Sequence, residues 1–161
     1  MSQHSTGTAS AAPADLKPVI MSEDTAERIR PLGIDMKVML GAEHTGGMFS
    51  AILGEVKPGE GPPSHLHHDR DEYFFVLAGT YRMTVGGKES TIGPGTIAFI
   101  PRGTAHAFTN ISAETGKLLE WTIPGGNGDY FREMDQMERS GGFNPETFAA
   151  INQKFVTEFV G

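Results

Sequence analysis

Residues 59–79 read GEGPPSHLHHDRDEYFFVLAG, and this stretch decides how the rest of the chain is arranged. A second stretch, residues 95–110, reads GTIAFIPRGTAHAFTN and complements the first. Together they contain four candidate metal ligands: His65, His67, Glu72 and His106. Neutral imidazole nitrogens suit divalent transition metals, and one carboxylate offsets part of their charge. The two stretches therefore predict a site for one divalent transition metal ion, without choosing among Fe, Mn, Ni, Co, Cu and Zn.

The spacing of these residues requires a turn inside the first stretch. Side chains alternate between the two faces of a strand, so His65 and His67 project to the same face. Glu72 has the opposite parity to His67 and would point away from the histidines if one strand continued through it. The polar segment HDRD, residues 68–71, is therefore predicted to turn, start a new antiparallel strand and return Glu72 to the histidines.

Composition and charge limit the classes of function. The chain has 161 residues, with 13 Lys plus Arg against 20 Asp plus Glu and a formal net charge of −7. No segment concentrates the basic residues, which argues against nucleic acid and anionic membranes as partners. The absence of cysteine excludes disulfides, thiolate ligands and cysteine nucleophiles. Since no apolar run approaches the roughly 18 residues of a membrane span, we expect a cytoplasmic protein.

Three segments are predicted along the chain. Residues 1–16 are small, polar and aperiodic, which predicts a flexible N-terminal arm. In residues 17–126, glycines and prolines separate short apolar runs, as is typical of a single all-β domain with many turns. From residue 127 to residue 161 the apolar period becomes helical, which predicts a C-terminal helical extension.

The C-terminal extension is expected to contain two helices. Tyr130, Met134 and Met137 recur at helical spacing in the first. Asn144 is a typical N-cap residue and Pro145 suits the first helical position, so the second helix is predicted to begin there. Its apolar stripe is expected to comprise Phe148, Ile151, Phe155 and Phe159. We interpret these residues as packing against the barrel exterior or a partner subunit rather than as a cofactor site.

The two stretches resemble the paired motifs of the cupin superfamily, and the resemblance covers about residues 48–123. The matching positions are Gly59, His65, His67, Glu72 and Gly79, followed by Gly95, Pro101, Gly103, His106 and Asn110. The resemblance implies an all-β fold, a small antiparallel jelly-roll-type β-barrel of about six to eight strands, with the helices outside it. The four candidate ligands would then point inward at one end and hold the metal. The alternative is a polar barrel mouth that holds no metal.

Other features resemble the quercetinase-like (quercetin 2,3-dioxygenase-like) single-domain cupins, namely the segments HHDRDEYFFVLAG and PRGTAHAFTN and the tail KFVTEFVG. This resemblance implies a metal-dependent dioxygenase that cleaves the ring of a flavonol-like, catechol-like or other enolic small molecule. Glu72 would be both a ligand and the catalytic base that accepts a substrate hydroxyl proton. Phe74, Val76 and Phe108 would form an apolar substrate-binding wall, with ordinary barrel core as the alternative for each. Phe99 and Trp121 are further candidates for this wall, but the sequence does not fix their orientation.

Two other functions remain open from the sequence. One is a metal-dependent isomerase or lyase in which the ion acts as a Lewis acid, and the other is a non-catalytic small-molecule-binding cupin. A sugar-phosphate isomerase would be expected to carry basic residues near the barrel mouth, and the only arginines nearby in the sequence are Arg70, Arg82 and Arg102. Because cupin barrels commonly pair through their outer sheets, the resemblance also implies a homodimer.

Overall fold

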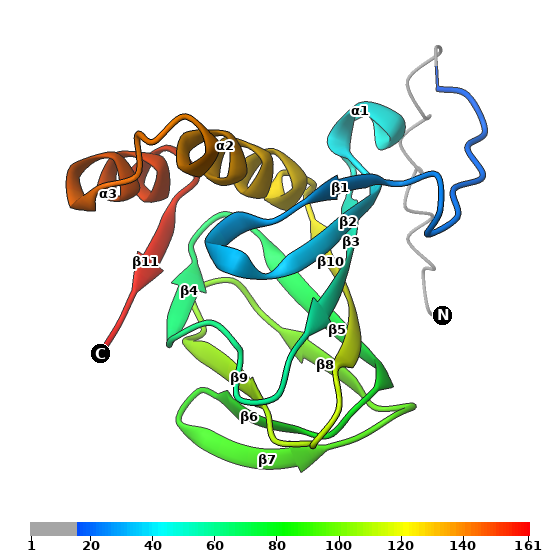
Figure 1. Ribbon diagram of the computed structural model, residues 1–161, viewed down its shortest axis with the longest axis vertical. Helices are drawn as coiled ribbons and strands as arrows, with labels where there is room; N and C mark the ends of the chain where they lie inside the picture. The colour runs from blue at the N-terminus through cyan, green and yellow to red at the C-terminus, as the bar shows by residue number, and fades with distance from the viewer. Residues whose placement is uncertain (1–15) are drawn as a thin grey trace, which may run out of the picture.

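The structure, a computed structural model, describes residues 16–161 and consists mainly of two facing antiparallel β-sheets (Figure 1). The six strands of the first sheet are, in order, β1 (Glu27–Ile29), β2 (Asp35–Leu40), β3 (Ser50–Val56), β10 (Gly116–Ile123), β5 (Asp71–Ala78) and β8 (Ile97–Ile100). The five strands of the second are β11 (Thr157–Phe159), β4 (His65–His67), β9 (His106–Asn110), β6 (Tyr81–Val85) and β7 (Lys88–Ile92). A 3-10 turn, η1 (Pro31–Gly33), joins β1 to β2, and a short helix, α1 (Ala42–Thr45), joins β2 to β3.

The all-β, jelly-roll-type prediction is confirmed, but the arrangement differs from a closed barrel of about six to eight strands. The strands of the described chain pair within two separate sheets, whose edges are β1 and β8 in the first and β11 and β7 in the second. The additional strands come from outside the motif region. β1 and β2 precede that region and widen the first sheet, whereas β11 follows the helices and widens the second.

The space between the sheets is filled by alternate residues of the facing strands. Along β5 the burial alternates residue by residue, so Glu72, Phe74 and Val76 point inward as their parity predicts. Both sheets contribute to one apolar cluster, comprising Val56, Phe74, Val76, Tyr81, Met83, Ile100 and Leu118. Burial of such a side chain stabilises a fold by about 1.5–3 kcal/mol. The core therefore holds the face of β5 that carries Glu72 in a defined orientation.

The Gly- and Pro-rich approach to β4 is tied to β9 by hydrogen bonds. The Gly59 N–H donates to the Asn110 carbonyl over 2.8 Å, and the Asn110 N–H donates to the Glu60 carbonyl over 2.9 Å. The buried Asn110 side-chain amide donates to two further backbone carbonyls. Gly61 approaches β9 so closely that a Cβ atom at this position would overlap the Phe108 carbonyl. These contacts hold the segment before β4 against the C-terminal end of β9, so β4 begins beside β9.

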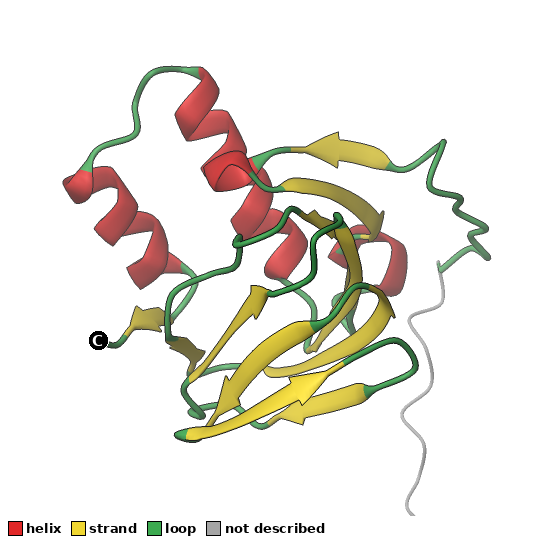
Figure 2. Ribbon diagram, turned by 60° about the horizontal axis from the view of Figure 1, so that its bottom comes forward, coloured by secondary structure: helices red, strands yellow, loops and turns green. Residues whose placement is uncertain are grey.

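Two helices follow the last strand of the first sheet, as predicted. They are α2 (Asn127–Arg139) and α3 (Pro145–Lys154), and they lie at one end of the two sheets (Figure 2). The Asn144 side chain accepts hydrogen bonds from the N–H groups of Glu146 and Thr147, each over 3.0 Å, and caps α3. Tyr130, Met134 and Ile151 form the buried contact between the helices.

The predicted extent of the second helix is wrong at its C-terminal end. α3 ends at Lys154, and Val156 adopts a positive φ of 51° that interrupts the helical path. The next residues form β11, which pairs with β4 in antiparallel register, Thr157 with His67 and Phe159 with His65. The apolar period alone did not predict this strand, because its hydrogen-bond partner is distant in the sequence.

The predicted flexible arm, residues 1–16, lies outside the described residues except for its last position. Within the described part of the chain, no helix is both long enough and apolar enough to cross a membrane.

Candidate metal centre

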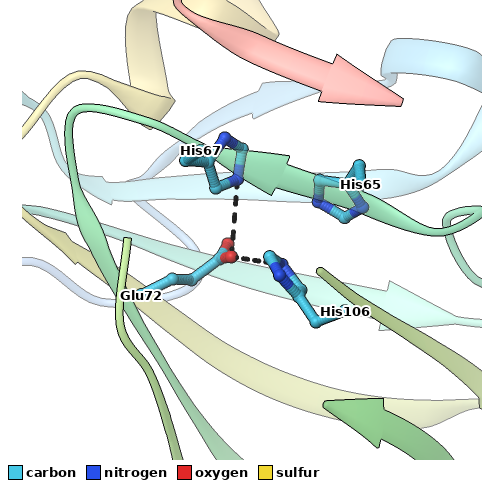
Figure 3. A group of neighbouring side chains, drawn as sticks. All are labelled: His65, His67, Glu72 and His106. Carbon is cyan, nitrogen blue, oxygen red and sulfur yellow. Dashed lines mark ion pairs between the residues drawn. The ribbon is translucent and has the colours of Figure 1, made fainter. Parts of the chain in front are cut away.

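Three strands bring the four predicted ligands together (Figure 3). His65 and His67 lie on β4, His106 lies opposite His65 on β9, and Glu72 reaches across from β5 of the other sheet. All four side chains are buried, and their candidate ligand atoms lie within 4.8 Å of one another. The predicted turn in HDRD exists, but it carries the chain from the second sheet to the first instead of pairing β4 with β5.

Three buried polar atoms converge on one point of this cluster. The Glu72 Oε2 atom lies 2.6 Å from His106 Nε2 and 3.4 Å from His67 Nε2. Among the described residues, none of these three atoms has a hydrogen-bond partner of acceptable geometry. Buried polar atoms without partners are costly, and a cation between them would satisfy all three. The cluster therefore fits a divalent metal ion, whose identity the donor set leaves open.

The second nitrogen of each imidazole is held by a neighbouring group. His65 Nδ1 lies 2.9 Å from the Pro63 carbonyl, and His106 Nδ1 lies 3.0 Å from the Thr104 carbonyl. A carbonyl can only accept, so Nδ1 carries the proton in both rings and Nε2 keeps a free lone pair. His67 Nδ1 lies 3.0 Å from the Thr157 hydroxyl. Such outer contacts orient ligating imidazoles in metal sites.

Burial and mutual charge shift the pKa values of the ligands. Burial, together with the charge of His106, lowers the pKa of His65 to about 4, and burial also lowers the pKa of His67. Burial alone would raise the pKa of Glu72, but contacts with His106 and His67 hold it well below its usual value. Burial alone would lower the pKa of His106, yet Glu72 raises it. The low pKa of Glu72 favours its ionised form, which can bind a cation, and metal binding competes with any proton at the imidazole Nε2 atoms.

A comparison with known protein families matches residues 52–122 to the family described as the cupin domain. The matched stretch, somewhat less than half of the chain, is similar to a cupin domain. It contains all four clustered residues, an arrangement typical of cupin metal sites. α2, α3 and β11 follow this cupin-like stretch in the sequence.

The chain is also similar to curated relatives and to solved structures. The mannose-1-phosphate guanylyltransferase ManC of Salmonella typhimurium is 38% identical over 80 residues, which cover 50% of this chain but only 16% of ManC. The structure of KdgF from Halomonas sp. matches with a TM-score of 0.61 at 16% identity, covering 69% of this chain and 99% of KdgF. A sugar phosphate isomerase of the cupin superfamily from Silicibacter pomeroyi matches with a TM-score of 0.58 at 21% identity, covering 65% and 75% of the two chains. The chain has the cupin fold.

Sequence reasoning missed a second buried carboxyl group beside the cupin ligands. Glu120 lies on β10, and burial and the charge of Glu72 raise its pKa well above its usual value. Asn127, the first residue of α2, donates its side-chain amide to Glu120 and, over 3.4 Å, to Glu72 Oε1. The strand pattern carries a signal for Glu120, because it shares the parity of Leu118 and Thr122, which are both buried.

A cavity of about 250 Å³ opens beside the cupin ligands. His65, His67 and Glu72 line it, and most of the other lining side chains are apolar and come from η1, β2, β3, α2 and β11. Glu60 and Glu120 are the other charged residues in the lining, and none of the described residues that line the cavity is a lysine or an arginine. The helical extension, expected only to pack, therefore supplies cavity walls through Tyr130, Phe131 and Met134.

The predicted substrate wall is only partly beside the cavity. Phe74 and Phe108 line it, whereas Val76 packs in the apolar cluster between the sheets. The proposal that Phe99 and Trp121 form walls is not supported, because both lie outside the cavity, stacked on Tyr73 at ring-centroid distances of 4.9 and 5.3 Å. Strand register is the cause: both pair with Tyr73, which has the opposite parity to Glu72.

Proposed function

We propose that this chain is a metal-dependent enzyme that opens a small catecholic or other enolic molecule with dioxygen. The observation that carries the proposal is the three-histidine, one-glutamate cluster beside a mainly apolar cavity without lysine or arginine in its lining. A neutral planar substrate suits such walls, with its hydroxyl groups directed at the ligands. The cavity, at about 250 Å³, is smaller than the roughly 300–1,000 Å³ usual for drug-sized ligands, which favours a single-ring catechol over a three-ring flavonol.

The residues of the chain would perform two tasks in this reaction. Phe74 and Phe108, in edge-to-face contact at 5.4 Å between ring centroids, would present an apolar wall to the substrate ring. Glu72, whose pKa is held low, would be ionised and would accept a hydroxyl proton. A bound divalent ion would supply Lewis-acid stabilisation of the substrate oxyanion and, if redox-active, reactivity toward dioxygen. Cleavage breaks one carbon–carbon bond, both oxygen atoms enter the product, and the substrate supplies the electrons.

A second candidate is a metal-dependent isomerase or lyase that uses the ion only as a Lewis acid. Glu120 favours it, because its carboxyl group lines the cavity beside Glu72 and offers a second position for a proton in transit. This reaction moves a proton between substrate atoms and consumes no dioxygen. Sugar phosphates, suggested by the names of relatives, suit this cavity poorly, because its lining carries three glutamates and no lysine or arginine.

Oxygen dependence separates the two candidates. We expect the Fe, Mn, Ni or Co form to convert catechols in air with uptake of one dioxygen per product. Both atoms of ¹⁸O₂ should appear in the product, and metal-free protein should be inactive. Product mass spectrometry and an oxygen electrode make the measurement, with a flavonol and a hexose phosphate as comparison substrates.

Turnover that continues unchanged under argon would contradict the oxygenase and favour the isomerase or lyase. If catechols shift the spectrum of the Co(II) form but none of the compounds is converted, the enzymatic proposal fails and a small-molecule-binding cupin remains. Tight binding of the hexose phosphate would contradict the argument from the charge of the cavity lining.

We also propose that the chain forms a homodimer through the outer face of the first sheet. Tyr73, Phe99 and Trp121 stack there, and Phe99 is 54% exposed. The neighbouring Ile97 and Ile123 are exposed too. β8, which carries Phe99, is an edge strand of its sheet and therefore leaves backbone groups unpaired. A self-complementary apolar patch at a sheet edge suits a two-fold pairing of identical chains.

Replacing Phe99 with glutamate is expected to convert the dimer to a monomer, because a two-fold interface would bury an unpaired charge from each chain. Light scattering coupled to gel filtration at micromolar concentration measures the change. Phe143→Glu is the matched control, since Phe143 is exposed but lies between the helices, away from this face. A monomeric wild-type chain would contradict the proposal.

A further inference from the structure

The hydroxyl group of Thr157, on the last strand of the described chain, contacts the ligand cluster from outside. Its Oγ1 lies 3.0 Å from His67 Nδ1, 3.0 Å from an Arg70 guanidinium nitrogen and 3.3 Å from the Phe155 carbonyl. β11 places it there by pairing Thr157 with His67. β11 also brings the Phe159 ring over His65, with the ring centroids 5.6 Å apart and the planes at 29°.

The chemistry of its three partners limits the directions of the hydrogen bonds that the Thr157 hydroxyl can make. A guanidinium can only donate and a carbonyl can only accept. The Phe155 carbonyl can therefore only receive the Thr157 hydrogen, whereas His67 Nδ1 can receive it or donate to the oxygen, depending on the tautomer. The Nδ1–H tautomer satisfies all three contacts at once, because Arg70 and His67 then donate to the two lone pairs and the hydroxyl donates to Phe155. This arrangement leaves His67 Nε2 unprotonated on the side of Glu72.

Arg70, in the HDRD segment between β4 and β5, anchors the arrangement. The side chain is 3% exposed and also donates to the Asn127 side-chain carbonyl and to the Phe155 carbonyl, both over 2.8 Å. Asn127 in turn contacts Glu72. One buried guanidinium is thus connected through Thr157 to His67 and through Asn127 to Glu72, so it links two of the four ligands to segments outside the cupin-like stretch.

We propose that β11 is part of the metal centre, with Thr157 as a positioning residue that Arg70 holds and that presents His67 Nε2 to the metal. The inference rests on the metal site described under the proposed function. A purely structural role for β11 would depend on its backbone pairing with β4 and would not require a hydroxyl group at position 157. The two roles therefore differ in how the protein responds to the loss of that one oxygen atom.

The test compares Thr157→Val, which removes the hydroxyl at nearly constant shape, with Thr157→Ser, which keeps it. Metal affinity is measured by competition with a chelating dye for Zn(II) and Co(II), and the visible spectrum of the Co(II) form reports ligand geometry. We expect Thr157→Val to bind about 10–100-fold more weakly and to shift the spectrum. Thr157→Ser should stay close to the wild type. Thr45→Val, which removes another buried hydroxyl bonded to a backbone carbonyl, is the matched control and should leave affinity unchanged.

A measurement on the unmutated protein tests the inference even if the variants misfold. In metal-free wild-type protein, ¹⁵N imidazole shifts should show His67 as the tautomer protonated at Nδ1. The opposite tautomer, or a Thr157→Val protein with wild-type affinity and spectrum, would overturn the inference while leaving the metal site intact. If the wild type binds no metal, the proposed metal site itself fails, and the two failures are thereby distinguished.

Discussion

Replacing His106 with alanine is expected to abolish stable metal binding. His106 supplies one of the four converging donors, and its Nε2 lies 2.6 Å from Glu72 Oε2. Its removal leaves three ligands and a cavity in the second sheet, so affinity should fall by more than the roughly 10–100-fold typical for loss of an outer hydrogen-bond partner. Elemental analysis after dialysis, followed by competition titration, measures the loss. His65→Ala should behave in the same way, because its ring lies beside that of His106 at 4.3 Å between centroids.

His68→Ala provides the matched control for these variants. His68 directly follows His67 but points outward, where its Nε2 lies 2.8 Å from Glu158 Oε2 at the surface. Removing an exposed pair of this kind costs little, and metal content should remain that of the wild type. Full metal retention in both His65→Ala and His106→Ala would mean that the ligands are assigned to the wrong residues.

The second large effect is expected for Gly61→Ala, although this substitution adds only one methyl group. Gly61 has a φ of 155°, and a Cβ atom there would overlap the backbone carbonyl of Phe108 on β9. Backbone cannot move aside as a flexible side chain can, so β9 must shift together with His106. We expect a loss of about 3 kcal/mol in the free energy of unfolding, and a melting temperature lower by about 6–12 °C. Chemical and thermal unfolding measure both quantities.

Gly87→Ala separates the overlap from the cost of the backbone conformation. Gly87 also has a positive φ, 80°, in the turn between β6 and β7, but a Cβ atom there would meet no other atom within 4 Å. It should therefore lose only the roughly 1–2 kcal/mol of the left-handed conformation. Equal destabilisation by the two substitutions would contradict the close approach of the Gly61 segment to β9.

The ligand cluster could be predicted from the sequence because it depends on local rules. The alternation of strand side chains placed His65 and His67 on one face and required a turn before Glu72, and the structure has both features. The orientations of Phe99 and Trp121 could not be predicted in the same way, because they depend on which residue of β5 each one faces. The register between strands is set by pairing across the sheet, and the spacing of residues within one strand carries no information about it.

Arg70 and β11 show a second limit. The polar composition of HDRD predicts a turn but contains no signal for a buried side chain, yet Arg70 is buried because Asn127, Phe155 and Thr157 accept hydrogen bonds from it. None of these partners is near Arg70 in sequence. Likewise, the spacing of phenylalanines in the tail continued the helical pattern past Lys154. The chain forms a strand there instead, because it pairs with the free edge of β4.

The pairing of β11 with β4 also has a consequence for the order of folding. Thr157 follows His67 by 90 residues, so this contact closes one of the longest loops in the described chain. Long loops close late, because the chain loses conformational entropy on closure before the contact contributes any stabilisation. During biosynthesis, β4, β5 and β9 leave the ribosome well before β11 and can assemble without it. His65 and His106 would then already be oriented by the Pro63 and Thr104 carbonyls, whereas His67 would gain its Thr157 contact only when the C-terminal strand docks.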